Sequence, residues 1–347
     1  MIFLEICIFS GVFIATYFGV RWYRALSLKR GLLDHPNERS SHVEPTPRGG
    51  GIIIAIVVLA VYAGASWLIS YEVSIGFATG AILIVAISLL DDIYSVSFAW
   101  RLLVHSVAAG IVVYSCGHIT FTDTSGPWAT TAEWIGRALT FAWIVWTLNA
   151  YNFMDGIDGI AGVQGVTAAA GWTMVAVYLG QPAVLMLSGA VLFASLAFLM
   201  HNWPPARIFM GDAGSAFLGF VLASMPFIVR PSGPVSTNRL VIVAVALLWL
   251  FIFDSVFTFI RRAARREKVW NAHREHLYQR LVRSGYSHRT VTLLYGGLSV
   301  IASAAAVFSL MSGSAFGNLV IIFTLASISL TVIVLCWKRG CLFGQSV

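Results

Sequence analysis

Five of the fifteen acidic residues stand at the ends of long apolar stretches. In chain order they are Asp91, Asp92, Asp155, Asp158 and Asp212. A carboxylate this close to hydrocarbon is costly unless it is paired, hydrated or bound to a cation. Any one of these acids could serve only as a helix cap, but five together favour a site for a divalent cation.

The segment 149–162 holds the densest group of polar side chains, because two amides and two of these acids recur in it at intervals of three residues. Asn149 and Asn152 would share one face of a helix, and Asp155 and Asp158 repeat the same spacing. Amide and carboxylate oxygens are the ligands that Mg²⁺ prefers, and Mg²⁺ usually binds together with phosphates. The segment therefore predicts a Mg²⁺ (or Mn²⁺) site. The alternative is a glycine-rich turn with side-chain caps.

Two polar loops carry basic residues that would suit a phosphate. The loop 261–289 joins an arginine-rich run to His273 and His276, which predicts contacts with a diphosphate. Zinc is disfavoured there because neither a cysteine nor a third histidine lies nearby. A helix lying along the membrane surface is the alternative for this loop. Arg48 precedes three glycines in the stretch 31–51, which indicates a turn able to hold a phosphate.

The composition assigns these residues to a membrane protein. Of the 347 residues, 58% are hydrophobic and 11% are charged, whereas about 25% of a soluble domain is charged. This excludes a soluble globule, a disordered chain and a disulfide scaffold. The four cysteines have no metal-binding spacing. We expect an all-α, polytopic integral membrane protein whose residues 1–347 form a single membrane-embedded domain.

About 11 transmembrane helices are predicted, since a span needs roughly 20 apolar residues. The first stretch follows no basic segment and is expected to be an uncleaved anchor. The predicted spans are 2–20, 51–70, 73–90, 99–119, 137–154, 160–179, 182–200, 213–229, 240–260, 290–311 and 317–337.

The lysines and arginines predict the orientation. Nineteen of the 22 fall on one side of the predicted membrane and three on the other, and the richer side is normally cytoplasmic. The N-terminus is then periplasmic and the C-terminus cytoplasmic. The net charge of +7 follows from topology, so no nucleic-acid partner is expected. The predicted cytoplasmic loops are 21–50, 91–98, 155–159, 201–212 and 261–289.

Taken in order, these motifs resemble the polyprenyl-phosphate N-acetylhexosamine-1-phosphate transferases, which include the phospho-MurNAc-pentapeptide translocase and the enzymes that initiate bacterial O-antigen. The Pro-Asn-x-Arg form is closer to the O-antigen branch. Family members often carry a denser late histidine cluster, whereas Glu275 lies between the two histidines here. The matching motifs are Pro36-Asn-x-Arg39-x-x-His42, Pro47-Arg-x-Gly-Gly, Asp91-Asp92, Asn149-x-x-Asn152-x-x-Asp155-Gly-x-Asp158-Gly, Gly211-Asp212-x-Gly-Ser and the late histidine loop.

The resemblance implies an enzyme of the bacterial inner membrane with its active site on the cytoplasmic face. It would transfer a sugar 1-phosphate from a UDP-N-acetylhexosamine to undecaprenyl phosphate and release UMP, as the first step of O-antigen or related envelope polysaccharide synthesis. GlcNAc, FucNAc and QuiNAc all stay open as the sugar, and the oligomeric state is open.

The resemblance also implies roles for single residues. Asn152 and Asp212 would contact Mg²⁺. Asp91 and Asp92 would serve the acceptor phosphate, and Asp155 and Asp158 the nucleotide pocket or the network around the metal. The remaining candidates for substrate binding are Asn149, Arg48, His273 and His276.

Two other classes of protein share part of this pattern. A CDP-alcohol phosphatidyltransferase motif begins much like Asp155-x-x-Asp158-Gly-x-Ala161, but Gly162 replaces the arginine that it needs, and its later acidic pair is missing. A secondary transporter would place acids within its spans. Only Asp254 lies well inside a predicted span, where it could pair with the basic cluster that begins at Arg261.

Overall fold

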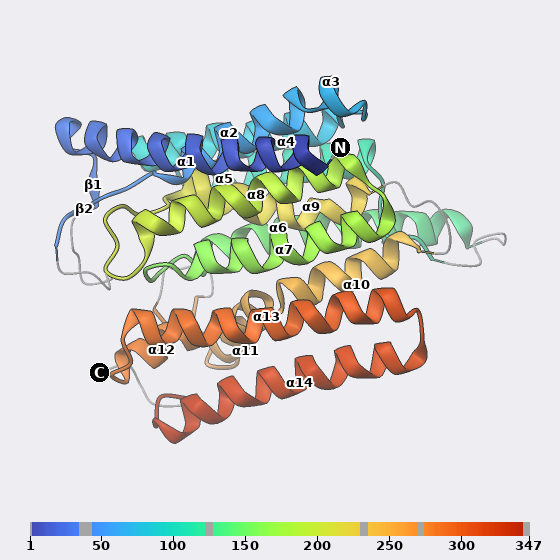
Figure 1. The fold of residues 1–347 in the computed structure, drawn as a ribbon. Coiled ribbons are helices and arrows are strands. Elements are labelled where there is room, and N and C mark those ends of the chain that lie inside the picture. The colour runs from blue at the N-terminus through green and yellow to red at the C-terminus, as the bar shows by residue number, and fades with distance from the viewer. Residues whose placement is uncertain (1, 35–43, 122–127, 230–234, 269–273, 343–347) are drawn as a thin grey trace.

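A computed structural model describes residues 2–34, 44–121, 128–229, 235–268 and 274–342. Within these ranges the chain forms a bundle of helices that lie side by side, with one pair of two-residue strands at one end (Figure 1). The strands β1 (Leu33–Asp34) and β2 (Thr46–Pro47) are antiparallel. The helices are α1 (Ile2–Arg30), α2 (Gly51–Gly64), α3 (Ser66–Ile69), α4 (Ile75–Tyr94), α5 (Phe98–Ser115), α6 (Ala129–Phe153), α7 (Ile160–Leu179), α8 (Pro182–Asn202), α9 (Asp212–Ile228), α10 (Thr237–Leu247), α11 (Trp249–Ala264), α12 (Leu277–Arg283), α13 (His288–Ser312) and α14 (Ala315–Lys338).

The helices confirm an all-α, multi-pass membrane protein. In the described ranges eight helices are long and apolar enough to cross a membrane, and the bent pair α10 and α11 makes a ninth candidate. All eleven predicted spans fall on helices. The count of eleven is not confirmed, however, because α9 has only 17 residues and α6 is not among the helices that are apolar enough. The orientation of the termini stays a prediction.

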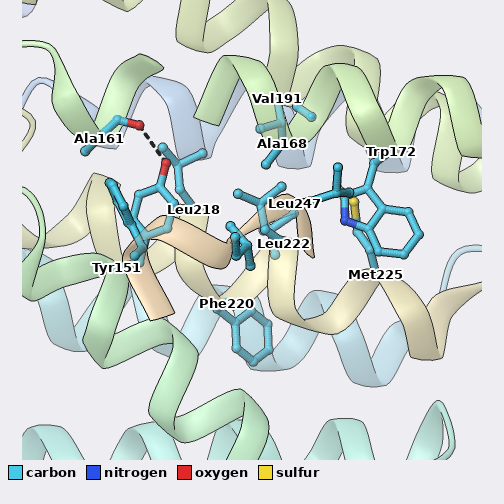
Figure 2. Packing of buried hydrophobic residues seen from close by; sticks show 14 of the residues in the cluster. Tyr151, Ala161, Ala168, Trp172, Val191, Leu218, Phe220, Leu222, Met225 and Leu247 are labelled. Atoms are coloured by element: carbon cyan, nitrogen blue, oxygen red, sulfur yellow. Dashed lines mark hydrogen bonds between the residues drawn. The ribbon is translucent and has the colours of Figure 1, made fainter. Parts of the chain in front are cut away.

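Helix α9 is the buried centre of the bundle. Every residue from Ala213 to Ile228 is buried, and the helix packs against α2, α4, α6 and α10. Its sequence is apolar on all sides after Asp212, which is typical of a helix enclosed by others. Figure 2 shows Phe220 pointing away from Trp172 of α7, and Phe220 stacks instead on Phe77 of α4. The helices packed around α9 therefore fix the position of its first residue, Asp212.

Glycines let α2 and α6 approach α9 at backbone distance. A Cβ atom on Gly51 would lie 2.4 Å from the Cα atom of Gly214, and one on Gly219 would lie 2.7 Å from the Cβ atom of Tyr151. Small residues at helix crossings allow this closeness and are typical of packing in membranes. These contacts hold the helix that begins at Asp212.

The predicted span 240–260 is not one continuous helix. It breaks at Leu248, where α10 and α11 meet at an angle of 76°. A break leaves backbone carbonyls unpaired, and in apolar surroundings they need side-chain donors. The buried Gln164 side chain of α7 donates to the Leu247 carbonyl at 2.7 Å and accepts from the Ser299 hydroxyl at 2.8 Å. The side-chain amide of Gln164 thus stabilises the break. The apolar pattern of residues 240–260 does not predict that break.

We predict that Gly51→Ala lowers the melting temperature of the detergent-solubilised protein, because the added methyl group meets the backbone of α9. Forced overpacking costs about 1–3 kcal/mol. The control is Gly64→Ala in the same helix, where nothing lies within 4 Å of the new atom. Equal melting temperatures for the two variants would contradict the close packing of α2 on α9.

Candidate active site

The N-terminus of α9 is where the predicted carboxylates meet. Asp212 begins α9, Asp91 and Asp92 lie in the last turn of α4, and Asp155 lies in the turn between α6 and α7. Because α4 and α6 both pack against α9, residues far apart in the sequence reach one end of this helix. Four of the five acids are therefore neighbours.

The carboxylate of Asp92 caps α9 from outside that helix. Its Oδ1 accepts the backbone N–H of Asp212 at 3.1 Å, and its Oδ2 accepts that of Ala213 at 3.2 Å. The first amides of a helix lack partners within it and carry partial positive charge, so an acid is favoured here. Gly211 precedes α9 with a φ of 75°, and a Cβ atom on it would lie 2.8 Å from Asp92 Oδ2. The glycine leaves room for the capping carboxylate.

A guanidinium joins the other two acids. Nη1 of Arg101, in the first turn of α5, lies 2.6 Å from Asp91 Oδ2 and 2.9 Å from Asp212 Oδ2. The adjacent acids of α4 thus have different partners, as their angular separation on a helix predicts. Arg101 is not among the site residues predicted from the sequence, where it counts only toward the orientation. Arg101 lies near the start of the predicted span 99–119, and this position gave no local signal for a bridging role.

The two predicted asparagines differ in what they contact. Asn152 Oδ1 faces α9, where it accepts the Ser215 hydroxyl at 2.5 Å. Asn149 Nδ2 instead donates to the Val145 carbonyl of its own helix at 2.7 Å. Of the pair, Asn152 is therefore the one held beside Asp212.

Asp155 lies in a strongly negative environment. Burial, and then the charges of Asp212, Asp92 and Asp158, raise the pKa of the Asp155 carboxyl well above its ordinary value. Like charges this close disfavour ionisation unless a cation joins them. The arrangement suits a divalent cation or a bound proton.

Asp158 anchors the turn after α6 to other elements. Its Oδ2 accepts the backbone N–H of Ala206 at 3.1 Å and lies 3.4 Å from Nδ1 of His288, the first residue of α13. Its carbonyl accepts the Thr292 hydroxyl at 2.8 Å. This carboxylate positions the Asn152–Asp155 turn, and its predicted part in the nucleotide pocket stays a prediction.

Two of the three glycines after Arg48 use their amides within the chain, and the predicted phosphate-binding turn stays a prediction. The Gly50 and Gly51 amides donate to the carbonyls of Phe209 and Met210, at 3.0 and 2.8 Å, so both are already used within the chain. The Arg48 side chain donates to the main-chain carbonyl of Asp92. The close approach to α9 explains Gly51, whereas a side chain at Gly50 would meet Ile208 and Phe198. Substrate binding by Arg48 stays a prediction.

His276 is buried, and its Nδ1 lies 3.2 Å from Asp254 Oδ1. Asp254 also accepts the backbone amides of Leu277 and Tyr278, at 2.8 and 3.0 Å, and the Tyr295 hydroxyl at 2.9 Å. The acid that a transporter would use is therefore an anchor for α12. Its direct hydrogen bonds go to the start of α12 and to Tyr295 of α13, and its charge also acts on Arg261, the suggested partner. His276 therefore helps to anchor α12. Its predicted contact with the diphosphate of the UDP-sugar stays a prediction. His273 lies outside the described residues.

Tyr278 connects α12 to the turn that bears Asn152 and Asp155. Its hydroxyl donates to the Phe153 carbonyl at 3.1 Å. A Cβ atom on Gly156 would lie only 2.1 Å from that hydroxyl oxygen. Gly156 is therefore required by the tyrosine, because any larger residue would meet the hydroxyl.

Glu275 pairs with three arginines of the segment 261–289. Its carboxylate lies 3.2 Å from Arg261, 3.1 Å from Arg262 and 3.1 Å from Arg280. All three arginines are buried. Burial alone would raise the pKa of Glu275, but the Arg280 hydrogen bond and the neighbouring guanidiniums lower it below the ordinary value. A buried, paired arginine has a structural role, so Arg262 contributes to the packing of this segment.

The family model of glycosyl transferase family 4 matches residues 74–230, which include the helices that bring the acidic and amide side chains together. The chain is 31% identical over 305 residues to a probable undecaprenyl-phosphate N-acetylglucosaminyl 1-phosphate transferase of Bacillus subtilis, covering 87% of this chain and 84% of that one. It is 29% identical to a decaprenyl-phosphate N-acetylglucosaminephosphotransferase of Mycolicibacterium smegmatis, covering 84% and 79%. An undecaprenyl-phosphate alpha-N-acetylglucosaminyl 1-phosphate transferase of Escherichia coli O157:H7 is 27% identical, with 82% and 78% covered.

The chain therefore belongs to the polyprenyl-phosphate N-acetylhexosamine-1-phosphate transferase family and is an enzyme. The similarity covers most of both chains, and the family model spans the segments that carry Asp91, Asn152, Asp155 and Asp212. The resemblance inferred from the ordered motifs is confirmed.

We predict that Asp254→Ala releases α12 from the bundle, because two backbone amides and the Tyr295 hydroxyl lose their acceptor. An unsatisfied buried group costs about 1–3 kcal/mol. Hydrogen exchange of residues 277 and 278 should accelerate, while exchange in α7 stays slow. The control is Glu133→Ala, which removes an exposed ion pair with Arg137 on α6. Unchanged exchange in α12 would contradict the anchoring role of Asp254.

We predict that Glu275 stabilises the fold in a pH-dependent way. The pKa of Glu275 is lowered in the fold, so its ionised form stabilises the protein above the ordinary value of 4.5, and that stabilisation disappears as the pH falls through the lowered pKa. Glu275→Gln should melt about 5 °C below wild type at pH 7. The difference should shrink as the pH drops below 4.5, and a constant difference would argue against this role.

Proposed function

We propose that the protein transfers a sugar 1-phosphate from a UDP-N-acetylhexosamine to undecaprenyl phosphate and releases UMP, at the cytoplasmic face of the bacterial inner membrane. The observation that carries the proposal is the convergence of Asp91, Asp155 and Asp212 with Asn152 at the start of α9. The names of the relatives support a polyprenyl-phosphate acceptor. They favour GlcNAc over FucNAc and QuiNAc, and initiation of O-antigen is one fate of such a product.

The residues present fit Mg²⁺ or Mn²⁺. All donors are carboxylate or amide oxygens, which hard cations prefer. Asp212 and Asn152 would hold the ion. Within the described residues, no three His, Cys, Asp or Glu side chains form a complete metal site, so amide and substrate oxygens would complete the coordination. A bound cation would neutralise negative charge on the diphosphate.

The chain's residues would mainly position the reactants. A phosphate monoester has a second pKa near about 6, so the acceptor is already largely dianionic and needs orientation more than deprotonation. Asp91 and Arg101, at the end of α4 and the start of α5, would orient it. An oxygen of the lipid phosphate would then attack the sugar-linked phosphorus as the bond to UMP breaks, so that UMP leaves with the bridging oxygen.

A covalent route is the mechanistic alternative, with an aspartyl-phosphate carrying the sugar. We favour single displacement. Labelled UMP should then exchange into the UDP-sugar only when lipid phosphate is present. Exchange in the rigorous absence of lipid would favour the covalent route.

We predict that Asp212→Asn and Asn152→Ala each reduce UMP release at least about 100-fold in saturating Mg²⁺, because an oxygen ligand of the ion is weakened or lost. The assay uses purified full-length protein, UDP-GlcNAc and undecaprenyl phosphate. Glu133→Gln, distant from the site, is the matched control. Near-normal turnover in either site variant, with an unchanged melting profile, would disprove the metal assignment.

A panel of UDP-sugars tests the donor separately. We expect UDP-GlcNAc to give the largest kcat/KM, on the strength of the names of the relatives. A higher kcat/KM with UDP-FucNAc or UDP-QuiNAc would change the assigned sugar without affecting the reaction class.

A further inference from the structure

A single nitrogen of Arg101 bridges the two acids to which different roles are proposed. Nη1 lies 2.6 Å from Asp91, on the acceptor side, and 2.9 Å from Asp212, the proposed metal ligand. Both carboxylates and the guanidinium are partly exposed, with side-chain exposures of 13%, 32% and 26%. This contact is therefore accessible to solvent and ligands.

Arg101 is the counter-ion of these two acids. In the described part of the chain, no other lysine, arginine or histidine nitrogen lies within 4.0 Å of either carboxylate. Arg48 donates to the main-chain carbonyl of Asp92 and leaves the nearby carboxylates to Arg101. The Nε atom of Arg101 is buried and has no hydrogen-bond acceptor among the described residues. The guanidinium therefore has a donor that the fold leaves unused.

We propose that Arg101 is an exchangeable counter-ion. It neutralises Asp212 when no divalent cation is bound, yields Asp212 Oδ2 when a cation binds, and then donates to a phosphate oxygen of the substrate. The proposal builds on the proposed function, because it takes Asp212 as a cation ligand.

Electrostatics sets the direction of the exchange. A guanidinium 2.9 Å from Asp212 Oδ2 occupies the position from which a cation would bind that oxygen, and the two positive charges repel each other. A phosphate offers the guanidinium paired acceptors, which its planar donors match well. Because coupling between sites is reciprocal, removing the guanidinium must raise the affinity of Asp212 for the cation.

The test is Mn²⁺ binding by the full-length protein in detergent without either substrate, followed by the electron paramagnetic resonance signal of free Mn²⁺. We expect Arg101→Gln to bind Mn²⁺ about tenfold more tightly than wild type, within the usual range of coupling between sites. Arg101→Lys keeps the positive charge and serves as the second variant in case Arg101→Gln fails to fold. Its affinity for Mn²⁺ should lie between those of wild type and Arg101→Gln. Arg137→Gln, which removes the exposed pair with Glu133, is the matched control. Equal or weaker Mn²⁺ binding by both Arg101 variants would overturn the proposal.

Asp212→Asn separates this proposal from the proposed function. If Asp212→Asn binds Mn²⁺ like wild type, Asp212 is not a ligand and the metal assignment itself fails. If Asp212→Asn loses Mn²⁺ while the Arg101 variants match wild type, only the counter-ion proposal fails.

The phosphate contact is tested by steady-state kinetics of Arg101→Lys. We expect at least a fivefold rise in KM for one substrate. A rise for undecaprenyl phosphate would identify the acceptor phosphate as the partner, and a rise for the UDP-sugar would identify the donor diphosphate. If neither KM rises, Arg101 does not bind phosphate, and that part of the proposal is wrong.

Discussion

The hydrogen bonds from the first two amides of α9 to the carboxylate of Asp92 are the contact on which the site depends. They join the end of α4 to the start of the most enclosed helix, whose unpaired amides and partial positive charge would otherwise be costly to bury. With Asp92 fixed in this way, the adjacent Asp91 is directed toward Arg101, and Arg101 in turn reaches Asp212. One capping interaction thereby sets the geometry of two helix ends and a guanidinium.

A second group of contacts positions the turn after α6, which carries Asp155 and Asp158. Tyr278 holds the Phe153 carbonyl, Asp158 holds the Ala206 amide, and Asn202 Oδ1 accepts the Gly159 amide at 2.9 Å. These contacts come from two parts of the chain, α12 and the segment at the end of α8, and each involves a main-chain atom of the turn or of its neighbour. The turn is thus fixed largely through its backbone and through Asp158. Asn152 and Asp155 then face the start of α9 from a rigid support, as a reacting site requires.

The sequence predicts the helices and the acidic end of the bundle well, for simple physical reasons. Long apolar stretches must be helical in a membrane. Several carboxylates at the ends of such stretches indicate one shared site. Contacts between helices are harder to predict, because they depend on rotation and tilt. Arg101 has no local signal for its bridging role, and Gln164 is one amide in an apolar helix that stabilises a distant break. His276 has the spacing of a ligand, yet it points to a buried acid.

Charge balance is the last constraint on how such a site can work. Within the described residues, Arg101 is shared between Asp91 and Asp212 while Asp92 is used by α9, and Asp155 lies near these acids. With all four carboxylates ionised, this end of α9 carries more negative than positive charge even when Arg48 is counted together with Arg101. A UDP-sugar diphosphate alone would then be repelled. Under the proposed function, a divalent cation must accompany or precede the nucleotide, since only an added positive charge reverses the local field. The guanidinium that such a cation displaces is then beside the incoming phosphates, so the charge that stabilises the empty site also becomes available to the reaction.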